Sequence, residues 1–242
     1  MTRIMAAHQP NYLPYLGFFD KLRCVDELGT EPGVFIIRDD AQYVKKEFHD
    51  RNKIRLNEGW KWLRVPVEKK MAPLNTIEIK EDGMISNIPW ADYHLRLIET
   101  NYKKTPFFDK FYSGLKKIYL NPGDKLVDFN MRIIKYLAEC FGIKTKIVLF
   151  SDIPKIVKGR NATESLVNIS KAVKADVYLA GAGSKVYLDI SCFNEIKLKL
   201  QDYEHPVYEQ RFPEFEPFMS AIDALFNIGY LPNSGEIVES SR

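Results

Sequence analysis

Cysteine is scarce in this sequence, and long apolar runs are missing. Cys24, Cys140 and Cys192 are its three thiols, with no CxxC pairing and no histidine at ligand spacing. Scattered thiols favour a reducing cytoplasm over a disulfide framework or a zinc site. No apolar run approaches the roughly 18 to 20 residues of a membrane span, and the amino terminus lacks the apolar region of a signal peptide. We therefore expect a cytoplasmic protein without a membrane-spanning segment.

An excess of one charge is also missing. The chain has 35 basic and 32 acidic residues, for a net charge of +3. A balance this close to neutral creates no strong field, which argues against nucleic acid and anionic membranes as partners. The motifs GxSxG, HExxH, DxD and the dinucleotide-binding GxGxxG are absent. A serine hydrolase, a metal site and an NAD site therefore have no motif to support them, and no cofactor is evident.

What the sequence does contain is an alternation of strand and helix patterns. This alternation favours an α/β fold with a mostly parallel sheet flanked by helices. We expect one domain over residues 1–242, with residues 90–141 as a helical insertion, subdomain or lid. Gly142 follows one helix as a C-cap would, and Thr163 can cap the start of another. Strands are predicted at 3–7, 34–38, 61–67, 77–80, 146–150 and 176–180, and helices at 16–25, 92–102, 106–120, 125–141, 163–173 and 219–226.

Polar clusters follow the carboxyl ends of three predicted strands. In open α/β sheets, ligands collect beyond these ends, so the clusters are expected to converge on one polar cleft. Pro10 and Pro14 stiffen the first cluster. The clusters are His8, Gln9, Asn11 and Tyr12, then Asp39, Asp40 and Gln42, and finally Gly181, Gly183, Ser184 and Lys185.

His8, Asp39 and Asp40 are the candidate catalytic residues. The pKa of histidine lies nearest neutrality, so His8 is suited to acid–base work or to stabilising charge. The alternative is a histidine bonded to backbone in a proline-rich turn. Adjacent carboxylates on an extended segment point to opposite sides, so at most one of the two aspartates is expected in the cleft. Turn chemistry is the alternative for both.

The remaining candidates are substrate-binding residues. Arg51, Lys53 and Arg55 share one face of an extended segment and can hold phosphate or carboxylate, although a solvated basic edge remains open. Amide side chains, Asn52 among them, are expected to bind hydroxyl groups. The GAGSK segment resembles an anion-binding turn but is not a P-loop, because VYLD after it reads as extended rather than helical. The amide candidates are Gln9, Asn11, Gln42 and Asn52.

Several blocks of the sequence resemble the WbqC-like protein family. The resemblance implies an accessory enzyme of bacterial surface-polysaccharide synthesis, including the O-antigen of lipopolysaccharide. It implies transfer of glycine or another small acyl group to an amino sugar. Our own expectation is a sugar or nucleotide sugar as substrate, with ATP or an activated acyl donor as co-substrate. The blocks are HQPNYLPYLGFFDKL (8–22), DDAQYVKKEFHDRNKI (39–54), GWKWLRVPV (59–67), residues 102–106, GIKTKIVLFSDI (142–153), YLAGAGSKVYLD (178–189) and IDALFNIG (222–229).

Two alternatives remain open. Pro14-Tyr-Leu-Gly17 at the start of the first helix resembles nucleotidyltransferases with the HxGH signature, which adenylate or cytidylate their substrates. Phe18 stands where the second histidine would be, and no KMSKS-like segment follows. The second alternative is a non-catalytic scaffold that binds carbohydrate or nucleotide. The oligomeric state is left open.

Overall fold

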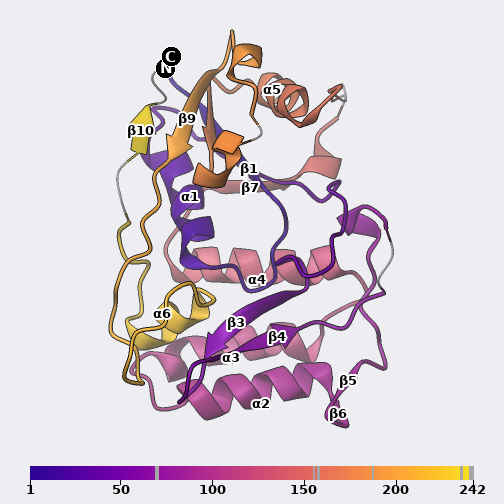
Figure 1. Ribbon diagram of the computed structural model, residues 1–242, viewed down its shortest axis with the longest axis vertical. Helices are drawn as coiled ribbons and strands as arrows, with labels where there is room; N and C mark the ends of the chain where they lie inside the picture. The colour runs from indigo at the N-terminus through magenta and orange to yellow at the C-terminus, as the bar shows by residue number, and fades with distance from the viewer. Residues whose placement is uncertain (69–70, 155, 157–158, 187, 235–236, 240–242) are drawn as a thin grey trace.

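A six-stranded sheet organises the fold (Figure 1). The computed structural model describes residues 1–68, 71–154, 156, 159–186, 188–234 and 237–239, without the side chains of residues 182, 185 and 237–239. Five strands run parallel, and β10 pairs antiparallel with β9 at one edge. In order across the sheet the strands are β10 (Ile237–Glu239), β9 (Lys197–Gln201), β8 (Val177–Ala180), β1 (Ile4–His8), β2 (Val34–Ile37) and β7 (Lys146–Leu149).

The strand order makes the sheet doubly wound. From β1 the chain passes to β2 and β7 on one side, then returns to β8 and β9 on the other. α1 (Leu16–Glu27) connects β1 to β2, and α5 (Ala162–Ala172) connects β7 to β8. Parallel strands need such crossovers, and the reversal between β1 and β8 leaves a crevice at their carboxyl ends. The predicted α/β fold is confirmed.

Each face of the sheet has its own hydrophobic core. In β1, Ile4 and Ala6 join a core that contains α1, whereas Met5 joins a core that contains α5. This follows from the two-residue period of a strand, which sends neighbouring side chains to opposite faces. Strands buried on both faces read as continuous apolar runs, as VFII in β2 does. The two helical layers therefore hold the central strands in fixed positions.

The chain between β2 and β7 packs against the α1 face of the sheet (Figure 1). It contains an antiparallel ribbon and three helices, whose apolar faces join the core of α1. Phe19 of α1 and Phe141, for example, have ring centroids 5.4 Å apart. Whether the helices act as a lid stays a prediction. The elements are β3 (Arg51–Arg55), β4 (Trp60–Arg64), β5 (Met84–Ile85), β6 (Ile88–Pro89), α2 (Trp90–Tyr102), α3 (Phe108–Leu120) and α4 (Leu126–Cys140).

After β9 the chain runs down to the ribbon, where the Ser220 N–H donates to the Lys53 carbonyl, and it then returns to the edge of the sheet as β10 (Figure 1). The predicted helix over 219–226 is shorter, as α6 (Ile222–Asn227), and packs against α2 and α3. None of the described helices is long and apolar enough to cross a membrane.

Some element predictions are wrong in detail. Residues 77–80 form no strand but two isolated bridges, Val67↔Ile79 and Glu78↔Lys125. VYLD is not extended throughout, because a 3₁₀ helix covers Ala182–Val186. Asn161, not Thr163, caps α5, since its side chain accepts a hydrogen bond from the Glu164 N–H. Gly142 does follow α4 with a positive φ of 72°, as predicted.

Candidate functional site

A cleft of about 790 Å³ opens at the carboxyl ends of β1 and β8, where the winding of the sheet reverses. This is the position at which open α/β sheets bind ligands. The cleft combines loops after the strands with the first turns of α1 and α5. Its lining includes His8, Gln9, Tyr15, Gly17, Lys21, Arg38, Glu47, Ala162, Gly181, Gly183, Ser184, Gln201 and Tyr203.

The loop that leaves β1 is held by polar contacts from three other segments. Asn52 of β3 donates to the Leu13 carbonyl at 2.6 Å, and Asn130 of α4 donates to the Pro10 carbonyl at 2.8 Å. The Ala221 N–H donates to the Pro14 carbonyl at 2.8 Å. Leu13 has a φ of 42°, a conformation that a side chain disfavours and that these contacts sustain. The loop is therefore rigid enough to position side chains.

His8 lines the cleft with a neutral ring. Its Nδ1 lies 3.0 Å from the Gln9 carbonyl oxygen, and its ring packs edge-on against Phe18 at 4.9 Å. Burial lowers the pKa of His8 well below its usual value, and nearby Lys21 lowers it further. A carbonyl can only accept a hydrogen bond, so Nδ1 carries the hydrogen and Nε2 keeps a lone pair. His8 Nε2 can thus accept a hydrogen bond from a group in the cleft.

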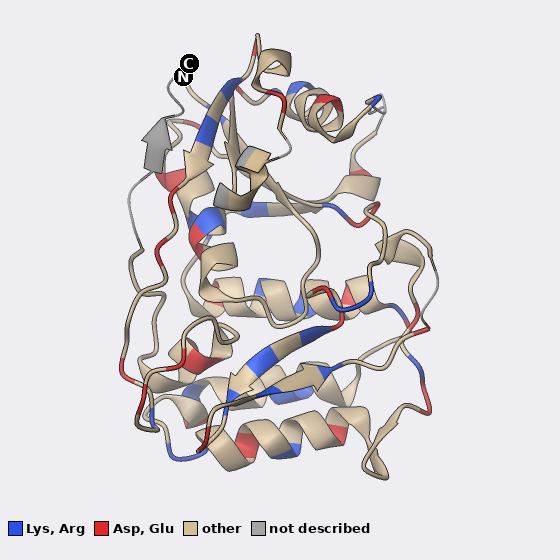
Figure 2. Cartoon of the chain, viewed as in Figure 1, with Lys and Arg blue, Asp and Glu red and all other residues tan. Residues whose placement is uncertain are grey.

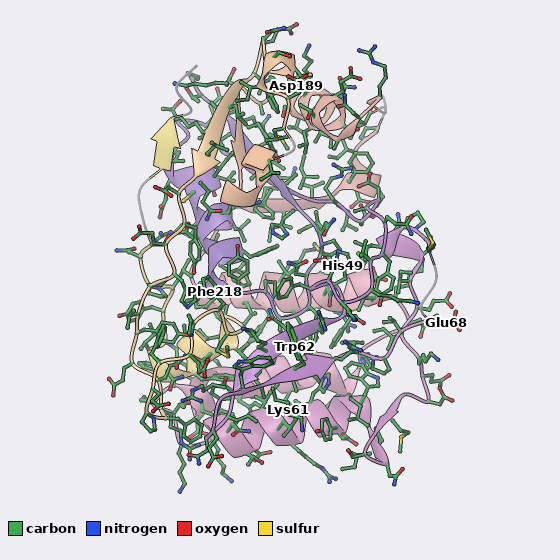
Figure 3. All side chains as sticks on the ribbon, in the orientation of Figure 1. His49, Lys61, Trp62, Glu68, Asp189 and Phe218 are labelled. Atoms are coloured by element: carbon green, nitrogen blue, oxygen red, sulfur yellow. The ribbon has the colours of Figure 1, made fainter. Side chains whose placement is uncertain are left out.

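Gln9 is oriented by a second histidine, His49, which lies just ahead of β3 (Figure 3). His49 Nε2 lies 2.7 Å from Gln9 Oε1, and Asn130 fixes the His49 carbonyl at 2.8 Å. Burial lowers the pKa of His49 to about 4, so its ring is neutral near pH 7. The contact leaves the Gln9 amide nitrogen available to the cleft.

The sequence predictions missed Lys21, as they missed Tyr15, Arg38, Gln201 and Tyr203 of the cleft lining. Lys21 is buried, yet none of the ion pairs of the described residues includes it, and its ammonium donates to the Ala7 carbonyl at 2.9 Å. Burial lowers its pKa to about 7. Gly181 faces it closely enough that an added Cβ would lie 3.9 Å from Nζ. The sequence does contain a sign of this burial, because Lys21 lies one helical turn from both Phe18 and Val25 and so belongs to the apolar face of α1.

Arg38 and the two aspartates lie at the β2 side of the cleft. Asp40 binds the Arg38 guanidinium through both oxygens, at 2.7 and 2.9 Å. Asp39 is buried and accepts the Ser151 N–H at 3.0 Å, which ties the end of β2 to the segment after β7. Arg38 lines the cleft, but neither aspartate does. The Asp39 carboxylate is taken up by internal contacts and the Asp40 carboxylate by Arg38, so neither lies where it would contact a ligand in the cleft, and their catalytic role stays a prediction.

The predicted basic cluster lies away from the cleft, on the β3–β4 ribbon. The Arg51 guanidinium lies 4.3 Å from the centre of the Trp62 ring, and the Lys53 ammonium 4.8 Å from that of Trp60. Arg55 is buried and donates to the backbone carbonyls of Leu56, Gly59, Pro213 and Glu214. Arg55 therefore joins the ribbon to the 213–214 segment and cannot reach a ligand in the cleft.

The other predicted residues outside the cleft also have structural contacts. Tyr12 is buried, with its hydroxyl bonded to His94 Nδ1 at 2.9 Å and to the Tyr119 hydroxyl. Asn11 is buried nearby, and Gln42 donates to the Ala72 carbonyl. The side chain of Lys185 lies outside the described residues. The cleft therefore unites members of the first and third predicted clusters: His8, Gln9, Gly181, Gly183 and Ser184.

The described residues contain no group of three or more histidine, cysteine or carboxylate side chains that could hold a metal ion. The cleft instead offers a neutral imidazole, the cations Lys21 and Arg38, of which Arg38 is paired with Asp40, one carboxylate, Glu47, and glycine backbone. Cationic nitrogen and open backbone suit an anionic ligand, and a lone pair on His8 suits proton transfer.

Strand order and cleft together place the protein in a class: doubly wound α/β proteins with a polar cleft at the switch point of the sheet. Residues 9–232 match the model of the WbqC-like protein family, and the chain belongs to this family. It is 32% identical over 229 residues to a Mycobacterium tuberculosis protein described as "Uncharacterized protein Rv1507c", covering 93% of this chain and 94% of that one. No solved structure matches the chain.

Proposed function

We propose that this protein is a cytoplasmic enzyme of bacterial surface-polysaccharide biosynthesis that transfers a small acyl group, such as glycyl, to a nucleotide-linked amino sugar. The observation that carries the proposal is Lys21, a buried cation without an acidic partner that faces Gly181 at the switch point. An unpaired buried charge is costly, and an anionic ligand in the cleft would offset that cost. A diphosphate is such a ligand.

The residues of the cleft can be given separate tasks in this reaction. The diphosphate would lie against Lys21 and the open backbone at Gly183, where an added Cβ would meet nothing within 4 Å. Negative charge there raises the pKa of Lys21 and keeps its ammonium charged. Tyr15 and Tyr203 pack edge to face, with ring centroids 5.7 Å apart, and would together offer one aromatic surface to a ring of the ligand.

His8 would supply the proton transfer. The amine of the sugar attacks the carbonyl carbon of the acyl donor, and a C–N bond forms while the leaving group departs with its electron pair. The amine loses a proton in this step, and His8 Nε2 would accept it, because the negative charge of the bound diphosphate raises the pKa of His8 from its lowered value. The donor is an activated acyl compound, which this reaction consumes. Gln9, oriented by His49, would bind a hydroxyl of the sugar.

Ligand binding tests this function directly. Thermal melts with a nucleotide-linked amino sugar, ATP and glycine should show stabilisation by the nucleotide sugar, because a ligand of the folded state raises stability by mass action. Lys21→Met should abolish the shift, whereas Lys104→Met, at an exposed turn residue, should keep it. The absence of any shift at millimolar ligand would favour the scaffold alternative.

Turnover separates catalysis from binding. With an activated glycyl donor, mass spectrometry should detect the glycylated sugar for the wild type. His8→Ala should lose turnover by a factor of about 10² or more while its melting temperature and its binding of the nucleotide sugar persist. A variant that fails to fold would instead assign His8 a structural role.

Nucleotidyl transfer remains a second candidate, and the sheet favours it. β1 is central in the sheet, with β2 and β7 on one side and β8 and β9 on the other. In sheets with this strand order, dinucleotides bind at the switch point. Against it, Phe18, at the place of the second signature histidine, is buried 5.2 Å from Phe35 and cannot reach a pyrophosphate. Stabilisation by ATP alone, with release of pyrophosphate on adding the acceptor, would raise this candidate above acyl transfer.

A further inference from the structure

A second hollow, of about 760 Å³, lies along β4 and α2 and shares no lining residue with the cleft. Three cations line it: Lys61 and Arg64 of β4, and Lys80. Trp62 and Tyr93 line it as well, and the rest of its lining is apolar. No acidic residue belongs to the described lining, so the hollow is cationic and aromatic at once.

The charges of the ribbon are arranged at a cost to stability. β3 and β4 have the sequences RNKIR and WKWLR, which contain no acidic residue, as the blue segments in Figure 2 show. Arg51 and Arg64 lie directly opposite each other in the register. Like charges in this position are destabilising, and no ion pair within 4.0 Å relieves Lys61, Arg64 or Lys80 among the described residues. Burial raises the pKa of the Asp50 carboxyl, and nearby Arg64 offsets part of that rise. The two side chains nevertheless form no ion pair within 4.0 Å.

Trp60 and Trp62 of the ribbon and Phe48 just before it are exposed or partly exposed, and their contacts hold them in place. Trp60 is 43% exposed and Phe48 42% exposed. Trp62 has the Arg51 guanidinium 4.3 Å from its ring centre and the Trp60 ring at 5.7 Å, nearly perpendicular. Such contacts fix the indole, and Lys61 lies 5.6 Å from the Tyr93 ring. Figure 3 shows Trp62 and Lys61 on β4, in the lower half of the molecule.

We propose that this hollow is a second ligand site that binds an acidic saccharide, with the acid group among Lys61, Arg64 and Lys80 and the sugar ring against Trp62 and Tyr93. The planar fork of arginine matches carboxylate and phosphate oxygens, and the two lysines add charge without fixing geometry. A volume of this size suits a ligand of one to a few rings. The near-neutral net charge of +3 argues against an extended nucleic acid site. The proposal does not depend on the activity of the cleft.

Direct titration tests the site with defined probes. The probes are glucose 6-phosphate and glucuronate, with glucose, inorganic phosphate and a short single-stranded oligonucleotide as comparisons. The indole N–H resonance of Trp62, assigned by Trp62→Phe, should shift saturably with both sugar acids. Glucose and inorganic phosphate should bind at least about tenfold more weakly, because glucose lacks the acid group and phosphate lacks the sugar ring.

Variants then separate the two parts of the recognition. Lys61→Gln combined with Lys80→Gln should weaken both sugar acids by about tenfold or more, while Lys116→Gln with Lys117→Gln, on exposed positions of α3, should leave them unchanged. Tyr93→Leu should weaken the sugar acids but not inorganic phosphate. Lys21→Met should leave this site intact, which distinguishes its failure from a failure of the cleft.

Three results would overturn the proposal. The first is no saturable shift of Trp62 with either sugar acid at millimolar concentration. The second is equal loss of affinity in the Lys61/Lys80 and Lys116/Lys117 variants, which would indicate charge screening over the whole surface. The third is tighter binding of the oligonucleotide than of either sugar acid, with the Lys61/Lys80 variant affecting the oligonucleotide more.

Discussion

At the scale of single residues, the buried ammonium of Lys21 lowers the stability of the folded protein, and the fold itself does not require a charge at this position. Its ammonium lies among apolar side chains with one carbonyl as partner, and burial lowers its pKa from 10.5 to about 7. Neighbouring Asp20 does not help, because it binds Arg23 and Gln201 instead. A group kept in such a position is a candidate for function rather than stability.

We predict that Lys21→Met stabilises the protein at low pH. Between pH 7 and 10.5 the unfolded lysine binds more protons than the folded one, so its contribution to the free energy of unfolding rises with pH across this window. Below pH 7 the lysine is charged in both states and the cost of burial is fully present. At pH 6 the variant should gain on the order of 2 kcal/mol, and this gain should shrink towards pH 10.5. Urea titrations of both proteins across that range measure the difference; a difference that is constant with pH would contradict it.

Histidine shows how burial decides chemistry at this scale. His49 and His94 have pKa values lowered by burial, to about 4 and about 3, and both act through hydrogen bonds to Gln9 and Tyr12. From the sequence, one histidine in a polar segment resembles another. Only the surroundings separate His8, which lines the cleft, from His49, which orients a neighbour.

At the scale of elements, the loop between β1 and α1 carries much of the candidate site. The sequence indicated a stiff turn from its two prolines, and the structure adds the clamps: Asn52 on β3 and Asn130 on α4. These asparagines are distant in sequence from the loop, so no local pattern could assign them to it. Asn52 was predicted to bind substrate because a polar side chain on a strand gives no sign of which face it occupies.

Asn130→Ala should weaken both the fold and the cleft. It leaves the Pro10 and His49 carbonyls without their donor, and each unsatisfied buried acceptor is costly, so we expect a loss of roughly 1–3 kcal/mol in the free energy of unfolding. Affinity for the nucleotide sugar should fall as well, because His8 and Gln9 lose their support. Asn194→Ala, at an exposed position, is the control. Unchanged stability and affinity in Asn130→Ala would refute the clamp.

At the scale of the whole molecule, the two hollows belong to different parts of the structure. The cleft gathers segments from the first and last thirds of the chain around β1, whereas the cationic hollow belongs to the chain between β2 and β7. The cleft and the hollow share no lining residue, so a ligand can occupy either one while the other is empty.

Hydrogen exchange should resolve the two sites. A nucleotide-linked amino sugar should slow exchange in residues 8–21, 181–184 and 201–203, because these line the cleft. Glucose 6-phosphate should slow exchange in 61–67 and 80–85 instead. If both ligands protect the same segments, the molecule has one site and the assignment of one hollow is wrong.

By itself the sequence determined the α/β fold, the family and the edge of the sheet where polar groups gather. These depend on hydrophobic period, on turn residues and on motif blocks, all of which are local in the chain. The tertiary structure decided which polar residues reach the cleft: it turned Asp39, Asn52 and Arg55 to internal contacts and brought in Lys21. The physical reason is that a side chain's hydrogen-bond partner and burial are set by segments far away in sequence, and those two quantities decide whether a charge serves the fold or a ligand.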